Sequence, residues 1–246
     1  MSTSPIELRF RPISATATIP LRHLVLWPSI PADQQLVPEY DFEPTTIHLG
    51  TFLSPSPSDT DTSTSTSTDT THVGSGTETG VEQQESSDSS EPLSLTHLSQ
   101  AQQDGKEPIA ILTLVHHDYP KPNTLPSHIR SSNPASALPT TQIQLHKFAV
   151  HPILQGKGVG RKSLFNAIDH LKSHQSQPTS SQSEQTKGTA EKEERGKVFF
   201  HFDARLVQRR FYEKCGMEVL DEQVFEKFGT TGKEPGVKHI RMGNII

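Results

Sequence analysis

A glycine-rich segment that follows a predicted strand and precedes a predicted helix constrains the fold more than any other feature of the chain. The apolar run at residues 148–150 leads through His151 and Pro152 into QGKGVG at residues 155–160. From residue 159 onward, apolar residues recur at helical spacing. Glycines allow positive φ and the close approach of a ligand, and the N–H groups that open a helix attract anions. The segment therefore predicts a phosphate-binding turn between a strand and a helix.

Two common phosphate-binding loops do not fit this segment. A Walker A loop, G-x-x-x-x-G-K-[ST], counted from Gly156 places Arg161 where the second glycine belongs. The dinucleotide fingerprint G-x-G-x-x-G lacks its last glycine whether it is counted from Gly156 or from Gly158. These mismatches argue against ATP-type and NAD-type sites and leave a nucleotide hydrolase only as a minor alternative.

Long polar tracts interrupt the apolar segments, so the hydrophobic content is 31%, below the roughly 45% of an ordinary globular chain. Residues 54–105 and 173–197 are mostly Ser, Thr, Gln and charged, and residues 119–140 are rich in Pro and Ser. Such tracts bury too little apolar surface to offset the entropy of ordering them. We therefore expect a single domain over residues 1–246, with disordered loop insertions at 54–105 and 173–197.

The charge and cysteine content exclude several classes of protein. The formal net charge of −5 argues against a broad basic face, so we expect no nucleic-acid partner. Cys215 is the single cysteine, which excludes an intrachain disulfide. We find no secretory signal pattern and no apolar run near the roughly 20 residues of a membrane span, so no membrane association is expected. The default compartment is cytoplasmic, with a nuclear location also open.

The hydrophobic patterns predict a mixed α/β (α+β) fold in the order β-α-β-β-β-α-β-α-β-β. Residues 18–31 are expected to hold a helical turn or two that Pro28 and Pro31 stop, and helices are expected from residue 159 and over 206–216. The last helix is expected to use Val207, Phe211 and Cys215 as its apolar face, with Gly216 as a positive-φ cap. Strands are expected at residues 6–13, 45–53, 107–117, 141–150, 197–204, 222–228 and 237–242.

A third loop pattern, [QR]-x-x-G-x-[GA], fits residues 155–160 without a mismatch. Together with this pattern, two segments resemble the strand–helix motifs of the GNAT superfamily of acyl-CoA-dependent N-acyltransferases. They are LHKFAVHPILQGKGVGRKSLF and, further on, DARLVQRRFYEKCGM. LRHLVLWPSIP and the closing GVKHIRM look like its small single-domain ElaA-like branch. Together these segments span nearly all of the expected ordered core.

The resemblance implies a splayed mixed sheet of about seven strands flanked by helices, with acetyl-CoA bound where the fourth and fifth strands part. Backbone groups of Phe148, Ala149 and Val150 would pair with the pantetheine amides, and the Val150 N–H would polarise the thioester carbonyl. The pyrophosphate would be held by the loop and by Arg161. The loop residues expected to contribute N–H groups are Gln155, Gly156, Lys157, Gly158, Val159 and Gly160.

The catalytic and acceptor residues are less strongly specified. Tyr212 is the expected acid that protonates the thiolate leaving group, although it also fits a core aromatic residue. For the base, His146 shares a predicted strand face with Phe148, and His201 shares one with Asp203. Asp203 stands where the superfamily more often has Asn, so it is a candidate to receive the substrate ammonium.

Two residues of the first predicted helix, His23 and Trp27, are expected to bind the acceptor, as is His201. Trp27 replaces the Arg expected in the ElaA-like branch. Cys215 fits a core position better than a nucleophile, and no metal-ligand spacing is recognisable.

The sequence thus predicts an N-acetyltransferase that moves the acetyl group of acetyl-CoA to a primary amine in a direct ternary complex. The acceptor amine is expected to belong to a small molecule or a peptide. The alternative is a catalytically weak acyl-CoA-binding protein whose Ser/Thr-rich insertion is regulatory.

Overall fold

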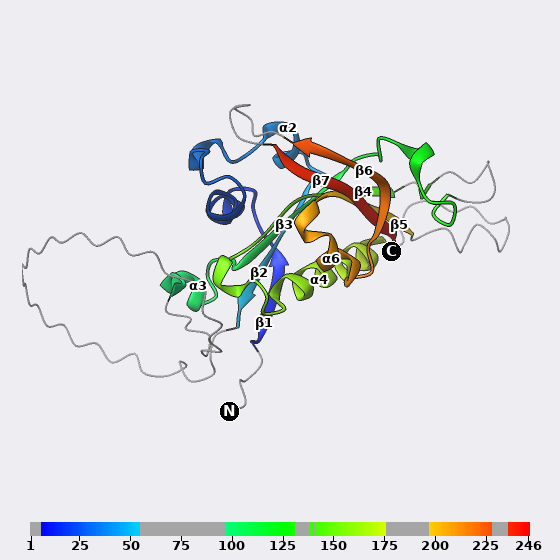
Figure 1. Cartoon of the computed structure of the whole chain (residues 1–246). Helices are drawn as coiled ribbons and strands as arrows, with labels where there is room; N and C mark the ends of the chain where they lie inside the picture. Colours follow the sequence, from blue (N-terminus) through cyan, green and yellow to red (C-terminus); the bar gives the residue numbers. More distant parts are fainter. Residues whose placement is uncertain (1–5, 55–96, 131–137, 140, 176–196, 228–235) are drawn as a thin grey trace, which may run out of the picture.

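The fold is built on one seven-stranded sheet with the strand order β1-β2-β3-β4-β5-β7-β6 (Figure 1). A computed structural model describes residues 6–54, 97–130, 138–139, 141–175, 197–227 and 236–246. The rest of the tracts predicted to be insertions, at 55–96 and 176–196, lies outside the described residues. The strands are β1 (Leu8–Pro12), β2 (Ile47–Leu53), β3 (Ala110–His116), β4 (Thr141–Val150), β5 (Val198–Arg205), β6 (Glu218–Lys227) and β7 (Val237–Ile245).

The pairing of the strands confirms the predicted mixed sheet. All neighbouring strands are antiparallel except β4 and β5, which run parallel. This parallel pairing covers only Thr141–Gln144 opposite Val198–His201, although both strands continue well beyond it. The sheet is therefore splayed at its centre, as the sequence predicts.

Two helices cover one face of the sheet, which we call the α4 face. The long helix α4 (Val159–Gln175) packs Leu164, Ile168 and Leu171 against buried residues of β4 and β5. The short helix α6 (Arg209–Glu213) follows β5, and the turn after it closes at Gly216, whose φ is 82°. Met217 N–H donates to Tyr212 O at 3.0 Å and Gly216 N–H to Glu213 O at 3.0 Å, which is the predicted glycine cap.

The predicted apolar face of this last helix is partly wrong. Val207 is 85% exposed, because residues 206–208 form a 3₁₀ turn, η8 (Leu206–Gln208), and α6 begins only at Arg209. A 3₁₀ turn has a different side-chain period from an α-helix, so Val207 does not align with Phe211 and Cys215. Leu206 packs against the core instead.

Short helical segments cover the opposite face, which we call the η2 face (Figure 1). Leu21 packs there on Ile111 and Ala149. None of the described helices combines the length and apolar character that crossing a membrane requires. The segments are η1 (Thr16–Thr18), α1 (Ile19–Leu21), the π-helix η2 (Arg22–Leu26), η3 (Ala32–Gln34) and α2 (Pro38–Asp41).

A buried ion pair fixes these segments to the sheet. The two terminal guanidinium nitrogens of Arg22 donate to the Asp41 carboxylate, at 2.6 and 2.7 Å, and one of them also donates to Thr113 Oγ1 of β3 at 2.7 Å. The two side chains are 0% and 1% exposed. Burial acts to raise the pKa of Asp41, but the bonds from Arg22 and the Val37 N–H outweigh it, and the pKa lies below its ordinary value.

Parts of the polar tracts belong to the folded core, which corrects the predicted boundaries. Leu98 is buried, and Ser99 forms a capping box that starts α3 (Gln100–Gln103), so residues 97–105 are folded. In the Pro/Ser-rich stretch, which includes η6 (Pro122–Thr124), the residues Tyr119, Leu125 and Ile129 pack against Phe199 and Leu220. A few apolar side chains at irregular spacing are enough to anchor each stretch to the core. Because their spacing is not periodic, the hydrophobic pattern does not predict their burial.

Candidate functional site

The point where β4 and β5 part is the main candidate site. Beyond Gln144 and His201, β4 pairs only with β3, and β5 pairs only with β7. His151 N–H donates to Ile109 O at 2.9 Å, which sets the alternation of the β3–β4 ladder. The N–H and C=O groups of Phe148 and Val150 therefore point away from β3, into the split. An extended ligand that carries amide groups could pair with this strand edge.

Ala149 does not share in this edge. By the same alternation its backbone groups face Ile111 of β3, and its side chain is 2% exposed among Leu21 and Ile111. Of the three strand residues that the sequence proposes for the cofactor, the backbone of two faces the split.

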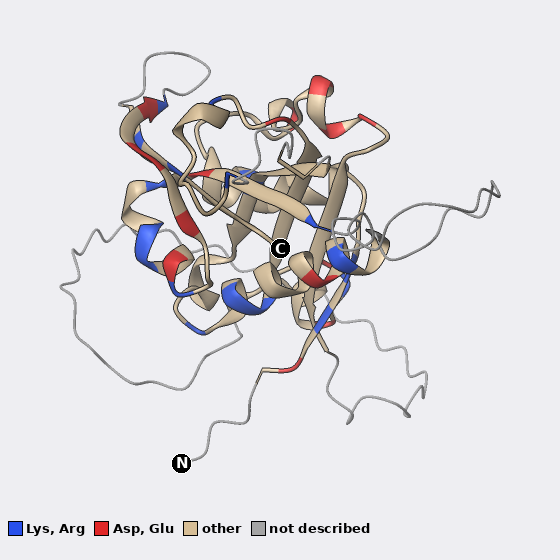
Figure 2. Cartoon of the chain, turned by 90° about the vertical axis from the view of Figure 1, so that its right-hand side faces the viewer, with Lys and Arg blue, Asp and Glu red and all other residues tan. Residues whose placement is uncertain are grey.

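The glycine loop joins the end of β4 to α4 through the 3₁₀ turn η7 (Pro152–Leu154). Gly156 and Gly158 have φ values of 72° and 83°, and a Cβ on either would meet nothing within 4 Å. These positions therefore need glycine for backbone conformation, and the space in front of them is open. The side chains of Lys157 and Arg161 are exposed. Figure 2 shows basic (blue) and acidic (red) positions along the helical ribbons of the chain.

The N–H groups of the loop divide into two sets. Gln155 N–H donates to Pro152 O at 3.1 Å and Lys157 N–H to Leu154 O at 3.4 Å, so both turn inward, contrary to the predicted cradle. The hydrogen-bond ladder of α4 starts with Lys162 N–H, which donates to Gly158 O at 3.1 Å. The N–H groups of residues 159–161 precede this ladder and open the helix, which is where an anion binds.

The loop is held closely against the split. Gln155 Nε2 donates to Val150 O at 3.0 Å, so its side chain folds the loop back onto the end of β4. A Cβ on Gly160 would lie 3.4 Å from Val150 Cγ2 and 3.6 Å from the rings of Phe148 and Phe211. The opened end of α4 thus lies close to the free edge of β4.

Tyr212 lies on the α4 face, on the β5 side of the split. Its ring centroid is 4.5 Å from that of Phe202 and 4.9 Å from that of Phe211, and the Phe211 ring lies 6.3 Å from Phe148 of β4. Burial raises the pKa of Tyr212 well above its ordinary value. The phenol therefore stays protonated near neutral pH and can donate a hydrogen bond, while the raised pKa makes it a weaker acid. Cys215 packs in the same core cluster.

His146 lies on the η2 face, contrary to the prediction that it shares a face with Phe148. The register of β3 and β4 shifts between Thr113 and Leu114, which pair with Lys147 and Leu145, so His146 is the extra residue of a β-bulge. A bulge breaks the period of two, so His146 contacts Tyr40, with ring centroids 4.5 Å apart. Burial lowers the pKa of His146 to about 3, which makes it a weak base.

Lys147 completes a cluster on the η2 face that sequence patterns do not reveal. Its ammonium nitrogen lies 4.4 Å from the Trp27 ring centroid and 3.3 Å from His146 Nε2. A lysine within a predicted strand is the available sequence signal, but nothing in the pattern shows which face of the sheet its side chain takes. We call Trp27, Tyr40, His146 and Lys147 the η2-face cluster.

The remaining predicted site residues are already engaged. Asp203 pairs with Lys227 at 2.7 Å and with Arg241 at 3.6 Å, so its carboxylate is not a free receptor for a substrate ammonium. His201 shares its strand face, as predicted, but it is 2% exposed and its Nε2 bonds His117 O at 2.8 Å. This burial argues against substrate contact by His201.

His23 stabilises the turn that follows η2. Its Nδ1 lies 2.9 Å from Ile30 O, and Gln35 Nε2 donates to the same oxygen at 2.7 Å. Of the two acceptor-binding residues predicted in this helix, Trp27 lies beside the split, whereas His23 supports the loop that positions it.

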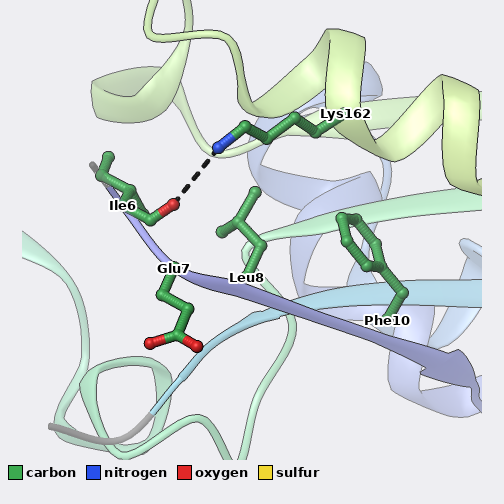
Figure 3. A pocket seen from close by; sticks show the side chains of 5 residues that line it. All are labelled: Ile6, Glu7, Leu8, Phe10 and Lys162. Atoms are coloured by element: carbon green, nitrogen blue, oxygen red, sulfur yellow. Dashed lines mark hydrogen bonds between the residues drawn. The ribbon is translucent and has the colours of Figure 1, made fainter.

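Two surface hollows lie away from the split. One, of about 400 Å³, is lined by the start of β1 and by Lys162, whose Nζ donates to Ile6 O at 3.3 Å (Figure 3). The other, of about 380 Å³, is lined by His116, His117, Asp118 and Gln142. No cluster of His, Cys, Asp and Glu suited to a metal ion is found in the described part of the chain.

Solved structures share this fold. Arabidopsis thaliana NAA60 in complex with acetyl-CoA matches with a TM-score of 0.50 at 10% identity, over 98% of this chain and 99% of that one. NAA60 with a bisubstrate analogue matches with a TM-score of 0.50 at 8% identity, over 98% of both chains. An IAA acetyltransferase from Bacillus cereus has a TM-score of 0.44 at 14% identity, over 98% and 100%.

The chain has the GNAT acetyltransferase fold, as its sequence motifs predict. No protein-family model matches the chain, and no curated protein matches its sequence. The ElaA-like branch stays a prediction.

Proposed function

We propose that the chain is an N-acetyltransferase that moves the acetyl group of acetyl-CoA to a primary amine in a direct ternary complex. The observation that carries this proposal is the continuity of two binding elements. The free edge at Phe148 and Val150 runs straight into the opened end of α4, where a Cβ on Gly160 would lie 3.4 Å from the Val150 side chain and 3.6 Å from the Phe148 ring. CoA carries amides in its pantetheine arm and a pyrophosphate beyond them, in the same order.

The donor would lie along β4 with its pyrophosphate at the N–H groups of residues 159–161 and its thioester near Val150. The Val150 N–H, which faces the split, would polarise the thioester carbonyl. Tyr212 would donate a proton to the sulfur as the carbon–sulfur bond breaks. Acetyl-CoA and a bisubstrate analogue bound to NAA60, which shares the fold, support direct transfer without a covalent enzyme intermediate.

The acceptor amine would approach from the η2 face, where Trp27, Tyr40 and Lys147 lie, because the α4 face is taken by the donor. A small-molecule amine and a peptide N-terminus both fit this proposal. We place the reaction in the cytoplasm, with the nucleus also open, as the sequence indicates.

Calorimetric titration of acetyl-CoA, followed by thiol release with spermidine, glucosamine, kanamycin, lysine and a tetrapeptide with a free N-terminus, tests the proposal. We expect acetyl-CoA binding and turnover with at least one amine. Binding without turnover would favour the alternative of a catalytically weak acyl-CoA-binding protein. Protection against heat by ATP but not by CoA would exclude both and favour a nucleotide hydrolase.

A further inference from the structure

Transfer to an amine requires a group that removes a proton from the acceptor ammonium before attack, and the proposed function leaves this group unassigned. The inference below rests on that proposed function. His146 is poorly suited, because burial lowers its pKa to about 3 and a base this weak seldom takes a proton from an ammonium. Asp203 is engaged by Lys227 and Arg241.

Lys147 has the position for this task. It follows the bulge of β4, and its side chain lies on the η2 face, one residue before the strand edge that faces the split. Its Nζ is held 4.4 Å from the Trp27 ring centroid and 3.3 Å from His146 Nε2. The neutral His146 ring lies within hydrogen-bond distance of Lys147 through its Nε2 and orients the amine, with the direction of the bond set by the tautomer of the ring.

The charges around Lys147 leave its ammonium form without a carboxylate partner among the described residues. Arg22 faces it from η2 and Lys227 from β6, and both cations oppose a further positive charge. The nearby Asp41 of α2 is bonded by Arg22 at 2.6 Å, and Asp203 of β5 is bonded by Lys227 at 2.7 Å. The uncharged His146 and Tyr40 complete the surroundings.

This environment makes both forms of the amine accessible near neutral pH. Burial first, and then Arg22 and Lys227, lower the pKa of Lys147 to about 7, while Asp41 opposes the shift. The Trp27 ring faces Nζ and stabilises the ammonium once it forms. A base performs best when its pKa lies near the working pH.

We propose that Lys147 is the general base of the acetyl transfer. Its neutral Nζ takes one proton from the acceptor ammonium and becomes an ammonium itself. The freed amine nitrogen attacks the thioester carbon, and the carbon–sulfur bond breaks. Sulfur receives the Tyr212 proton, the second nitrogen proton returns to Tyr212 through solvent, and Lys147 releases its proton to solvent. The products are an amide, free CoA and one proton.

The test compares the full-length chain with Lys147→Met and Lys147→Arg, using the most reactive amine of the panel above. kcat/KM is measured from pH 6 to 9.5, and acetyl-CoA affinity is measured by calorimetry. We expect kcat/KM of the native chain to fall as the pH drops below about 7, which is the acid limb of its pH profile. Both variants should lose roughly 100-fold or more in kcat and lose this limb, with unchanged acetyl-CoA affinity. Lys106→Met is the matched control, since Lys106 is exposed and pairs with Asp104, and its activity should be unchanged.

The arginine variant separates a base from a cation that binds an anionic group of the acceptor. Arginine keeps the charge but does not give up a proton in this pH range. Recovery of native kcat by Lys147→Arg, or an unchanged acid limb in Lys147→Met, would overturn the role of Lys147 and leave the acetyltransferase proposal standing. A native chain that binds acetyl-CoA and acetylates none of the amines overturns the proposed function, and the base with it.

Discussion

The two faces of the split are built by different means. On the α4 face, the candidate site is formed by backbone groups. These are the strand edge of β4, the opened end of α4 and the glycines at 156 and 158. On the η2 face, side chains from distant parts of the sequence meet, with Trp27 over Lys147 and Arg22 paired to Asp41. Backbone geometry leaves a local motif in the sequence, whereas a side-chain cluster depends on long-range packing. The half of the site proposed to bind the donor can therefore be predicted from the sequence, and the half proposed to bind the acceptor cannot.

The largest effect is expected from breaking the ion pair that holds the η2 face. Arg22→Met leaves the Asp41 carboxylate buried beside His48 without its cation, and should lower the free energy of unfolding by about 3–5 kcal/mol. Urea unfolding measures this loss. The double variant Arg22→Met/Asp41→Leu should recover a large part of it, because no buried charge is left unpaired. A loss below about 1 kcal/mol in the single variant would show that Asp41 reaches solvent.

On the α4 face, the largest effect on rate is expected from Tyr212→Phe. The ring and its contacts with Phe202 and Phe211 are kept, while the proton donor is lost. We expect kcat to fall roughly 100-fold with little change in acetyl-CoA affinity, measured by thiol release and calorimetry. Tyr119→Phe is the control, since Tyr119 is a buried tyrosine of another core cluster. An unchanged kcat in Tyr212→Phe would assign Tyr212 to packing alone.

A smaller effect is expected from straining the loop. Gly158→Ala forces a side chain into φ of 83°, which costs about 1–2 kcal/mol, and the loop relieves it by moving its N–H groups. Acetyl-CoA affinity should fall about tenfold. Gly216→Ala imposes the same strain at φ of 82°, also in open space, but outside the loop. Equal loss of affinity in both variants would mean that global stability, not the loop, controls binding.

The sequence predicts β4 to the residue and the glycine cap at Gly216, because each depends on neighbours along the chain, and the family resemblance implies the splayed mixed sheet. It misses the bulge at His146, since one extra residue is invisible until β3 fixes the register. If the bulge is ignored, the side-chain alternation of a regular strand places His146 on the same face as Phe148, whereas it lies on the η2 face.

Arg22 shows the second limit of sequence reasoning. It is fully buried in a segment where an arginine would be expected at the surface. Its partners, Asp41 and Thr113, come from α2 and β3, and only the folded sheet brings them together. Lys147 is hidden for the same reason, because its neighbours Trp27 and Lys227 lie far away in the sequence.

The smallest expected effect is a pH dependence of stability that belongs to the η2 face. His146 titrates at 6.5 when unfolded and, because of burial, its pKa is about 3 in the folded chain. Between these values the unfolded state binds more protons, so stability is present above pH 6.5 and falls as the pH drops toward 3. The limit for one group is about 1.4 kcal/mol per pH unit, and partial exposure of His146 reduces it.

His146→Asn removes this titration while keeping a polar side chain at the bulge. Urea unfolding at pH 7 and pH 5 should show a larger loss of stability in the native chain than in the variant. His174→Asn is the control, because His174 lies exposed at the end of α4, and it should follow the native chain. An equal pH dependence in the native chain and His146→Asn would place the His146 ring in water. In that case the imidazole would again be available as a base, and the hydrogen bond that orients Lys147 would be lost.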